Sequence, residues 1–165
     1  MADPEPATGQ PLRVVFVCWG NICRSPMAER VARKAAADAG LDSVEFSSAG
    51  TSREELGAPI DPRAVDVLAA HGYSTDGHRA HQITRAEIED ADLVIAAEPI
   101  HLDKMRRIAP DADNLSLLSA YDPAAAPGSG LPDPWYGGPE GFVDTLTAIE
   151  AAVPGVLDEV RALQG

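Results

Sequence analysis

The apolar run over residues 12–17 is followed at once by an eight-residue loop and then by a segment whose apolar residues have helical spacing. This is the pattern of a buried β-strand, a connecting loop and an α-helix. Further apolar runs over residues 44–48, 92–97 and 115–118 predict three more strands. Because predicted helices separate these strands, we expect them to lie parallel in one sheet with helices on both faces.

Five segments are predicted to be helical. Asp61 followed by Pro62 is typical of a helix start, as is Thr84, and Gly40 is typical of a helix end. The expected helices cover residues 25–39, 61–72, 84–91, 99–108 and 142–163. Within the last of these, the pair Pro154-Gly155 predicts a kink or a break.

These elements define the fold class as α/β: a single-domain, doubly wound, four-stranded parallel sheet of the flavodoxin-like kind. Residues 12–165 are expected to form the domain. Residues 1–11 contain three prolines and little apolar content, so we expect a disordered tail there. In such folds ligands bind at the carboxyl ends of strands near a topological switch point, which is where the loop after residue 17 stands.

The charge balance restricts the partners of this chain. With a formal net charge of −13 over 165 residues, it is not expected to bind nucleic acid or an anionic membrane. It has no apolar segment of about 18 residues that could span a bilayer and no signal-peptide pattern at its start, so we expect a cytoplasmic protein, and a monomer. The two cysteines, Cys18 and Cys23, suit neither a disulfide framework nor a zinc site, and we expect no metal and no cofactor.

The loop from Cys18 to Ser25 has the features of an anion site. Gly20 and Asn21 tolerate left-handed backbone angles, so the backbone N–H groups of the loop can turn inward around one oxyanion. The following helix aims the positive end of its dipole at the same point. Cys18 would supply a thiolate at the bottom of the loop. The guanidinium of Arg24 would form one side of the site and donate two hydrogen bonds to the phosphate, an arrangement that suits nucleophilic attack on phosphorus.

Cleavage of a phosphate ester also needs an acid for the leaving group. Asp133 is the candidate because Pro134, the next residue, favours an extended backbone that presents the carboxyl group. Trp135 and Tyr136 come next and would line the mouth of the site, where they can stack on an aryl group. Asp61-Pro62 and Asp122-Pro123 are Asp-Pro pairs of this chain for which no such catalytic role is expected.

Together these segments resemble the low molecular weight protein tyrosine phosphatases, over nearly the whole chain after the tail. The resemblance implies that Cys18 is a nucleophile that forms a phosphocysteine, that Arg24 clamps the phosphate, and that Asp133 acts first as acid and then as base. It also implies a phosphotyrosine-containing protein as substrate. The matching segments are Cys18–Glu29, Ser47–Thr51, Asp61–Ala64, His71–Gly72, His78–Ala80, Tyr121–Pro123 and Asp133–Gly138.

The same resemblance assigns the phosphate-binding loop and the residues that support it. The other loop residues are Trp19, Gly20, Asn21, Ile22, Cys23 and Ser25. The residues that match the family's supporting hydrogen-bond network are Asn21, Ser25, Ser48 and His78. The hydroxyl of Ser25 can donate to the sulfur of Cys18 and so ease its departure as a thiolate.

Three positions depart from the family pattern. Trp19 comes directly after the nucleophile, where a small or aliphatic residue is usual, and residues 52–56, on the opposite wall of the pocket, lack the usual aromatic residue. His81 stands where the family tends to have arginine. Trp19 could replace the missing aromatic residue or narrow the mouth. We expect the substrate pocket to contain Trp19, Glu54, Trp135 and Tyr136.

Two other functions are open on the same fold. An arsenate reductase would use the same anion loop but pass oxidation through further cysteines, and the chain has none after Cys23. A phosphate-binding module without turnover would not need the full set of nucleophile, arginine and acid. Among phosphatases, the phosphoarginine-directed relatives carry threonine where Ile22 stands, so phosphotyrosine is favoured.

Cys23 is predicted to be a redox partner of Cys18. An accessible thiolate is readily oxidised to a sulfenic acid, which a neighbouring thiol can capture as a disulfide. The alternative is that Cys23 only packs beneath the loop.

Overall fold

The computed structural model describes residues 10–136 and 138–165. Of the disordered tail expected over residues 1–11, the first nine residues lie outside this described part, and Gln10 and Pro11 lead into the first strand. Among the helices of the described residues, none is long and apolar enough to cross a membrane.

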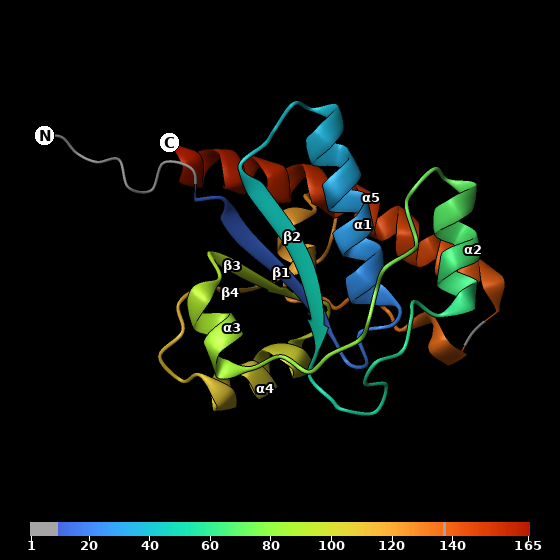
Figure 1. Ribbon diagram of the computed structural model, residues 1–165, viewed down its shortest axis with the longest axis horizontal. Helices are drawn as coiled ribbons and strands as arrows, with labels where there is room; N and C mark the ends of the chain where they lie inside the picture. Colours follow the sequence, from blue (N-terminus) through green and yellow to red (C-terminus); the bar gives the residue numbers. More distant parts are fainter. Residues whose placement is uncertain (1–9, 137) are drawn as a thin grey trace, which may run out of the picture.

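Four parallel strands form one sheet (Figure 1). They are β1 (Leu12–Cys18), β2 (Val44–Gly50), β3 (Leu93–Ala96) and β4 (Leu115–Leu117). Their order across the sheet is β2-β1-β3-β4, so the chain leaves β1 toward one edge and later returns to pair β3 with the other side of β1. The topological switch point therefore lies at the carboxyl end of β1, and the predicted doubly wound parallel sheet is confirmed.

The helices begin and end at local sequence signals. In the described residues they are α1 (Arg24–Asp38), α2 (Pro62–Ala70), α3 (Arg85–Asp90), α4 (Pro99–Ile108) and α5 (Pro139–Gln164), with short 3-10 helices η1 (Leu118–Tyr121) and η2 (Pro134–Tyr136). The side chain of Asp61 accepts a hydrogen bond from the backbone N–H of Arg63 and caps α2, as expected. Thr84 and Glu87 form a reciprocal capping box at the start of α3.

The sheet separates two hydrophobic cores. Successive side chains of β1 point to opposite faces, so Phe16 joins the core beneath α1 and α5 while Val17 joins the core beneath α3 and α4. Figure 1 shows α3 and α4 gathered on one side of the strands and α1 and α5 on the other, with α2 at the right beside the first part of α5. Both faces of the sheet are therefore covered, and the carboxyl ends of the strands stay open for a site.

Of the kink or break expected at Pro154-Gly155, the break does not occur. Helix α5 continues through Pro154, because its apolar side chains, Val153 and Val156 among them, are buried in the core and hold the helix on the sheet. Gly155 does not interrupt the helix but allows it to pack closely against a neighbouring segment. A Cβ atom at this position would collide with the backbone oxygen of Tyr121, so glycine lets α5 pack directly against η1.

Candidate active site

The loop over residues 18–25 joins β1 to α1 at the switch point of the sheet. Asn21 adopts a left-handed conformation, with φ of 62°, which this residue type tolerates better than most. The loop also passes very close to the end of β2. A Cβ atom on Gly50 would lie 2.7 Å from the backbone oxygen of Trp19, so only glycine at the end of β2 allows this approach.

Cys18 lies at the bottom of this loop and is 3% exposed. Its Sγ atom lies 3.0 Å from the hydroxyl of Ser25, which can donate a hydrogen bond to a thiolate. The contact joins the last residue of β1 to the first turn of α1, so a strand and a helix of the scaffold fix the two groups relative to each other.

Asn21 is the centre of the hydrogen bonds beneath the loop, and its side chain is fully buried. Its amide nitrogen donates to the hydroxyls of Ser25 at 2.9 Å and of Ser48 at 3.0 Å. Its amide oxygen accepts from the backbone N–H of His81 at 3.0 Å, and its backbone oxygen accepts from Nε2 of His78 at 2.6 Å. Hydrogen bonds thus join the four residues of the predicted supporting network, Ser25 and Ser48 through the side chain of Asn21 and His78 through its backbone.

Ser48 extends this network to Glu29, a carboxylate of α1 that sequence reasoning did not single out. The hydroxyl of Ser48 donates to Glu29 at 2.6 Å, and the guanidinium of Arg33 lies 2.6 Å from the same carboxylate. His78 is half-buried, and this burial lowers the pKa of its imidazole from the ordinary value. A neutral imidazole with its proton on Nε2 fits the hydrogen bond to Asn21.

Arg24 is 3% exposed and is held by three acceptors. One Nη donates to the backbone oxygen of Leu131 at 2.7 Å and lies 2.9 Å from the carboxylate of Glu98. The other Nη lies 3.7 Å from Asp133. Sequence reasoning missed Glu98 and Leu131. Glu98 comes after β3 at the same edge of the sheet, so the rule that sites form at strand carboxyl ends could have pointed to it.

His101 completes the surroundings of Glu98. Its Nδ1 accepts a hydrogen bond from the backbone N–H of Glu98 at 3.1 Å, and its side chain is 1% exposed. Burial, reinforced by the positive charge of Arg24, lowers the pKa of His101 to about 4. The imidazole beside the anion site is therefore neutral at physiological pH.

Asp133 is the Asp-Pro aspartate that reaches this pocket. Its Oδ1 atom accepts from the backbone N–H of Trp135 at 3.0 Å, and Asp122 accepts from Ala124 in the same way at 2.9 Å. Local turn geometry is therefore alike at the two positions. What separates them is that Asp133 lies beside Arg24 and lines the pocket, whereas Asp122 does not.

The pocket above the loop has a volume of about 170 Å³. The residues that line it are Cys18, Trp19, Gly20, Ile22, Cys23, Arg24, Glu54, Glu55, Asp133 and Trp135. The structure thus brings together every predicted pocket residue except Tyr136, whose side chain lies outside the described part. A larger cleft of about 850 Å³ runs beside β2, but neither cysteine nor Asp133 lines it.

Trp19 is fixed at the rim of this pocket by contacts from two other segments. Its indole Nε1–H donates to Glu54 at 3.0 Å, and Nζ of Lys104 from α4 lies 4.1 Å from the centroid of its ring.

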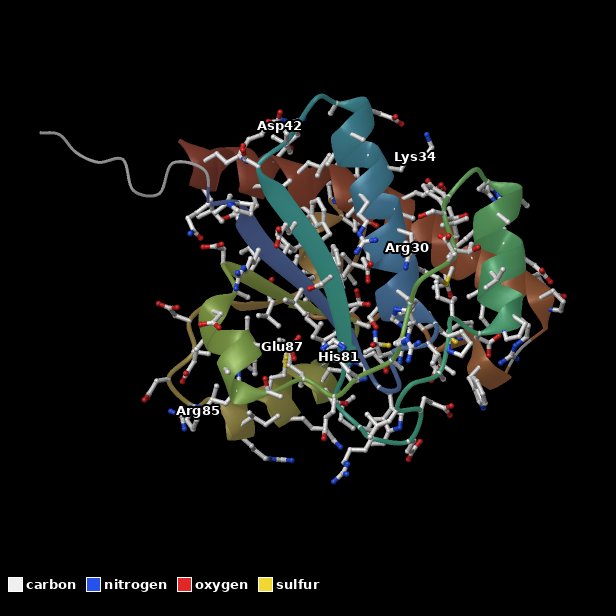
Figure 2. All side chains as sticks on the ribbon, in the orientation of Figure 1. Arg30, Lys34, Asp42, His81, Arg85 and Glu87 are labelled. Atoms are coloured by element: carbon white, nitrogen blue, oxygen red, sulfur yellow. The ribbon has the colours of Figure 1, made fainter. Side chains whose placement is uncertain are left out.

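His81, the third position that departs from the family pattern, does not line this pocket. Its imidazole donates to Glu87 of α3 at 2.7 Å, and the two side chains face each other in Figure 2. The hydrogen bond to Glu87 raises the pKa of His81.

Cys23 is buried and lines the same pocket, and both cysteines are free thiols. Burial, followed by the negative charges of Asp61 and a Cys18 thiolate, raises the pKa of the Cys23 thiol well above its ordinary range. Cys23 therefore stays a protonated thiol at neutral pH. Among the described residues, no group of three or more histidine, cysteine, aspartate or glutamate side chains is arranged to hold a metal ion.

Comparison with known proteins agrees with this geometry. Residues 13–164 match the family model described as low molecular weight phosphotyrosine protein phosphatase. The chain is 50% identical over 154 residues to a low molecular weight protein-tyrosine-phosphatase of Streptomyces coelicolor, covering 90% of this chain and 93% of that protein.

The chain is also similar to two solved structures. YfkJ from Bacillus subtilis has a TM-score of 0.88 and 29% identity, with 95% and 99% of the two chains covered. Wzb from Vibrio vulnificus, in complex with benzylphosphonate, has a TM-score of 0.79 and 28% identity, with 90% and 98% covered.

A loop with a cysteine and an arginine, at the switch point of a doubly wound parallel sheet, is shared by phosphatases and arsenate reductases of this fold, and the family model and the curated relatives place the chain in the class of phosphatases. Within that class, the chain belongs to the low molecular weight protein tyrosine phosphatase family. It is a protein-tyrosine-phosphatase, and the predicted family and enzyme class are confirmed.

Proposed function

We propose that the protein hydrolyses phosphotyrosine in protein substrates through a phosphocysteine on Cys18. The observation that carries this proposal is the meeting of Cys18, Arg24 and Asp133 in one pocket, with the guanidinium fixed by the backbone oxygen of Leu131 and the carboxylate of Glu98. A fixed guanidinium offers its donors to the equatorial oxygens of the transferring phosphoryl group without reorganising during the reaction.

The reaction has two steps. In the first, the Cys18 thiolate attacks phosphorus, the bond to the phenolic oxygen breaks, and Asp133 gives its proton to that oxygen. In the second, Asp133 takes a proton from water, the water oxygen attacks phosphorus, and Cys18 leaves as a thiolate. Ser25, 3.0 Å from the sulfur, stabilises this thiolate by donating a hydrogen bond.

The rim of the pocket supports an aryl phosphate as the substrate. Trp135 is 42% exposed and lines the pocket together with Trp19, so two indoles are available to a substrate ring. Tyr136, which follows Trp135 in the sequence, is proposed as a further residue at the rim of the pocket. The structurally similar Wzb holds benzylphosphonate, an aryl compound with a phosphonate group. The net charge of −13 disfavours nucleic acid and anionic membranes as partners.

Hydrolysis of 4-nitrophenyl phosphate in the presence of EDTA tests this proposal. We expect turnover by the wild type, none by Cys18→Ser, and a loss of roughly 10²–10³-fold in kcat by Arg24→Ala, the range for removing one preorganised donor. Cys23→Ser is the matched control, because it changes the other thiol of the loop and should keep most of the turnover.

The alternatives give other outcomes. A phosphate-binding module would bind inorganic phosphate but turn over no aryl phosphate. An arsenate reductase would consume a thiol reductant when arsenate is added. Substantial turnover by Cys18→Ser, or a requirement for added divalent metal, would contradict the phosphocysteine mechanism.

A further inference from the structure

Arg63, at the start of α2, holds the segment that carries the proposed acid. One Nη donates to the backbone oxygen of Trp135 at 3.1 Å. The carbon of its guanidinium lies 4.8 Å from the ring centroid of Trp135 and 4.8 Å from that of Phe142 in α5. A single side chain therefore contacts both the backbone and the ring of Trp135.

The other edge of the same guanidinium is connected to the phosphate-binding loop by hydrogen bonds through Asp61. Nε and Nη2 of Arg63 donate to the two oxygens of Asp61 at 3.1 and 3.0 Å. Asp61 is 7% exposed, and its backbone N–H donates to the backbone oxygen of Ile22 at 2.9 Å. Burial alone would raise the pKa of Asp61, but the hydrogen bonds from Arg63 outweigh it and lower the pKa, so the carboxylate stays charged.

Asp133 itself has few restraints. Its side chain is 39% exposed, and its two polar contacts in the described residues are the backbone N–H of Trp135 at 3.0 Å and Arg24 at 3.7 Å. The chain from Asp122 to Asp133 contains no helix or strand, so no regular element fixes the carboxyl group. The position of Asp133 therefore depends on where Trp135 is held, and Arg63 is the charged side chain that holds it.

We propose that Arg63, anchored by Asp61, is a positioning residue that fixes the acid segment over residues 133–135 against the phosphate-binding loop and so aims Asp133 at the leaving group. Arg63 does not itself line the pocket. The inference rests on the proposed role of Asp133 as general acid. Only arginine offers a planar fork that can bind a carboxylate with one edge, a carbonyl with another and an aromatic ring with its face, so lysine cannot replace it.

A series of aryl phosphates separates this role from a merely structural one. Protonation matters little when a good leaving group such as 2,4-dinitrophenolate departs, and much when phenolate departs. For Arg63→Ala we expect kcat/KM, which reports only the steps up to departure of the phenolic oxygen, to fall by about 10–100-fold with phenyl phosphate, the scale of a misplaced catalytic group, and to change little with 2,4-dinitrophenyl phosphate. Arg63→Lys should behave like Arg63→Ala. Inhibition by inorganic phosphate should be unchanged, because that ligand needs the loop but not the acid.

A double-mutant cycle with Asp133→Asn provides the sharper test. If Arg63 acts through the carboxyl group, then Arg63→Ala added to Asp133→Asn should cost less than about twofold further with phenyl phosphate. Arg85→Ala is the matched control, since it breaks an arginine–carboxylate pair of 2.8 Å between Arg85 and Glu89 on α3, and it should leave kcat unchanged for every substrate. Thermal unfolding of each variant checks that the fold is retained.

The outcomes are distinct. A loss in Arg63→Ala that is equal for all leaving groups, or that adds fully to the loss in Asp133→Asn, would overturn the positioning role, as would no loss at all. If Asp133→Asn itself shows no dependence on the leaving group, the acid assignment fails, and the role of Arg63 fails with it. A leaving-group-dependent loss in both single variants with no additivity in the pair supports both.

Discussion

Replacing Asn21 by alanine should reveal how strongly one buried amide holds the phosphate-binding loop. The substitution removes two hydrogen bonds donated to Ser25 and Ser48 and one accepted from the backbone of His81. It also places alanine at φ of 62°, a backbone angle that asparagine tolerates better. The change therefore acts on the side-chain network and on the backbone together.

The size of the effect can be worked out from these contacts. Each of the three hydrogen bonds is worth about 1 kcal/mol net, and the partners left unpaired are themselves buried or partly buried, which keeps the loss near that value or above it. The left-handed backbone adds about 1 kcal/mol for alanine. We therefore expect Asn21→Ala to lower the free energy of unfolding by about 4 kcal/mol, a large part of the roughly 5–15 kcal/mol that holds a domain of this kind folded.

Urea denaturation of Asn21→Ala and Asn21→Gly measures the two parts separately. Glycine loses the same hydrogen bonds but accepts a positive φ, so it should be more stable than the alanine variant by about 1 kcal/mol. Both variants should lose kcat/KM with aryl phosphates, because the loop that presents Cys18 is no longer fixed from below.

Asn114→Ala is the matched control for this experiment. Its amide donates to the backbone oxygens of Ile88 and Ala91 at 2.8 and 2.9 Å, away from the loop, so it should lose stability without losing kcat/KM. A loss of stability below about 2 kcal/mol in Asn21→Ala, or equal losses of kcat/KM in the Asn21 and Asn114 variants, would contradict this role of Asn21.

Three further predictions concern single side chains near the loop. Trp19→Leu should raise kcat/KM severalfold for a phosphotyrosine peptide and leave inhibition by inorganic phosphate unchanged; a comparable change in both would indicate a distorted loop instead. Peroxide should oxidise Cys18 to a sulfenic acid that the Cys23 thiol converts to a disulfide with release of water, so Cys23→Ser should regain less activity than wild type on adding a thiol reductant. Because the pKa of His101 is about 4 in the folded protein and about 6.5 in the unfolded chain, its contribution to stability is present above pH 6.5 and is lost as the pH falls toward 4. The free energy of unfolding should therefore drop by up to about 3 kcal/mol across this range, and by less in His101→Leu, as urea titrations at each pH would show.

The elements of this fold could be predicted from the sequence because their signals are local. The apolar runs, the cap at Asp61, the capping box at Thr84 and the proline at position 99 each act within a few residues, and the structure has the corresponding elements. The absence of a break at Pro154 has a tertiary cause. Burial of the apolar face of α5 and the close approach of Gly155 to η1 keep the helix continuous in spite of the lost backbone donor.

The contacts of the site were harder to predict because they join distant segments. Glu98 reaches Arg24 across 74 positions of the chain, and Arg63 reaches Trp135 across 72, and nothing beside either residue in the sequence marks the pairing. The choice of Asp133 depends on the three residues after it, Pro134 to Tyr136, and on the family resemblance. Asp122 makes the same local hydrogen bond, so turn chemistry alone would not separate the two.

In the proposed mechanism, the residues that bind the phosphoryl group are separate from the rim residues that contact the rest of the substrate. Cys18, Arg24 and Asn21 are at most 3% exposed and are fixed by one buried hydrogen-bond network and by Glu98, so a change at any of them disturbs the anion site itself. Trp19 lies at the rim and is held by an exposed side chain, Glu54, and a half-buried one, Lys104. Such contacts are worth little to stability and can be exchanged without moving the buried groups. A tryptophan beside the proposed nucleophile is therefore compatible with phosphatase chemistry, and its effect should fall on which phosphotyrosine segments enter the pocket.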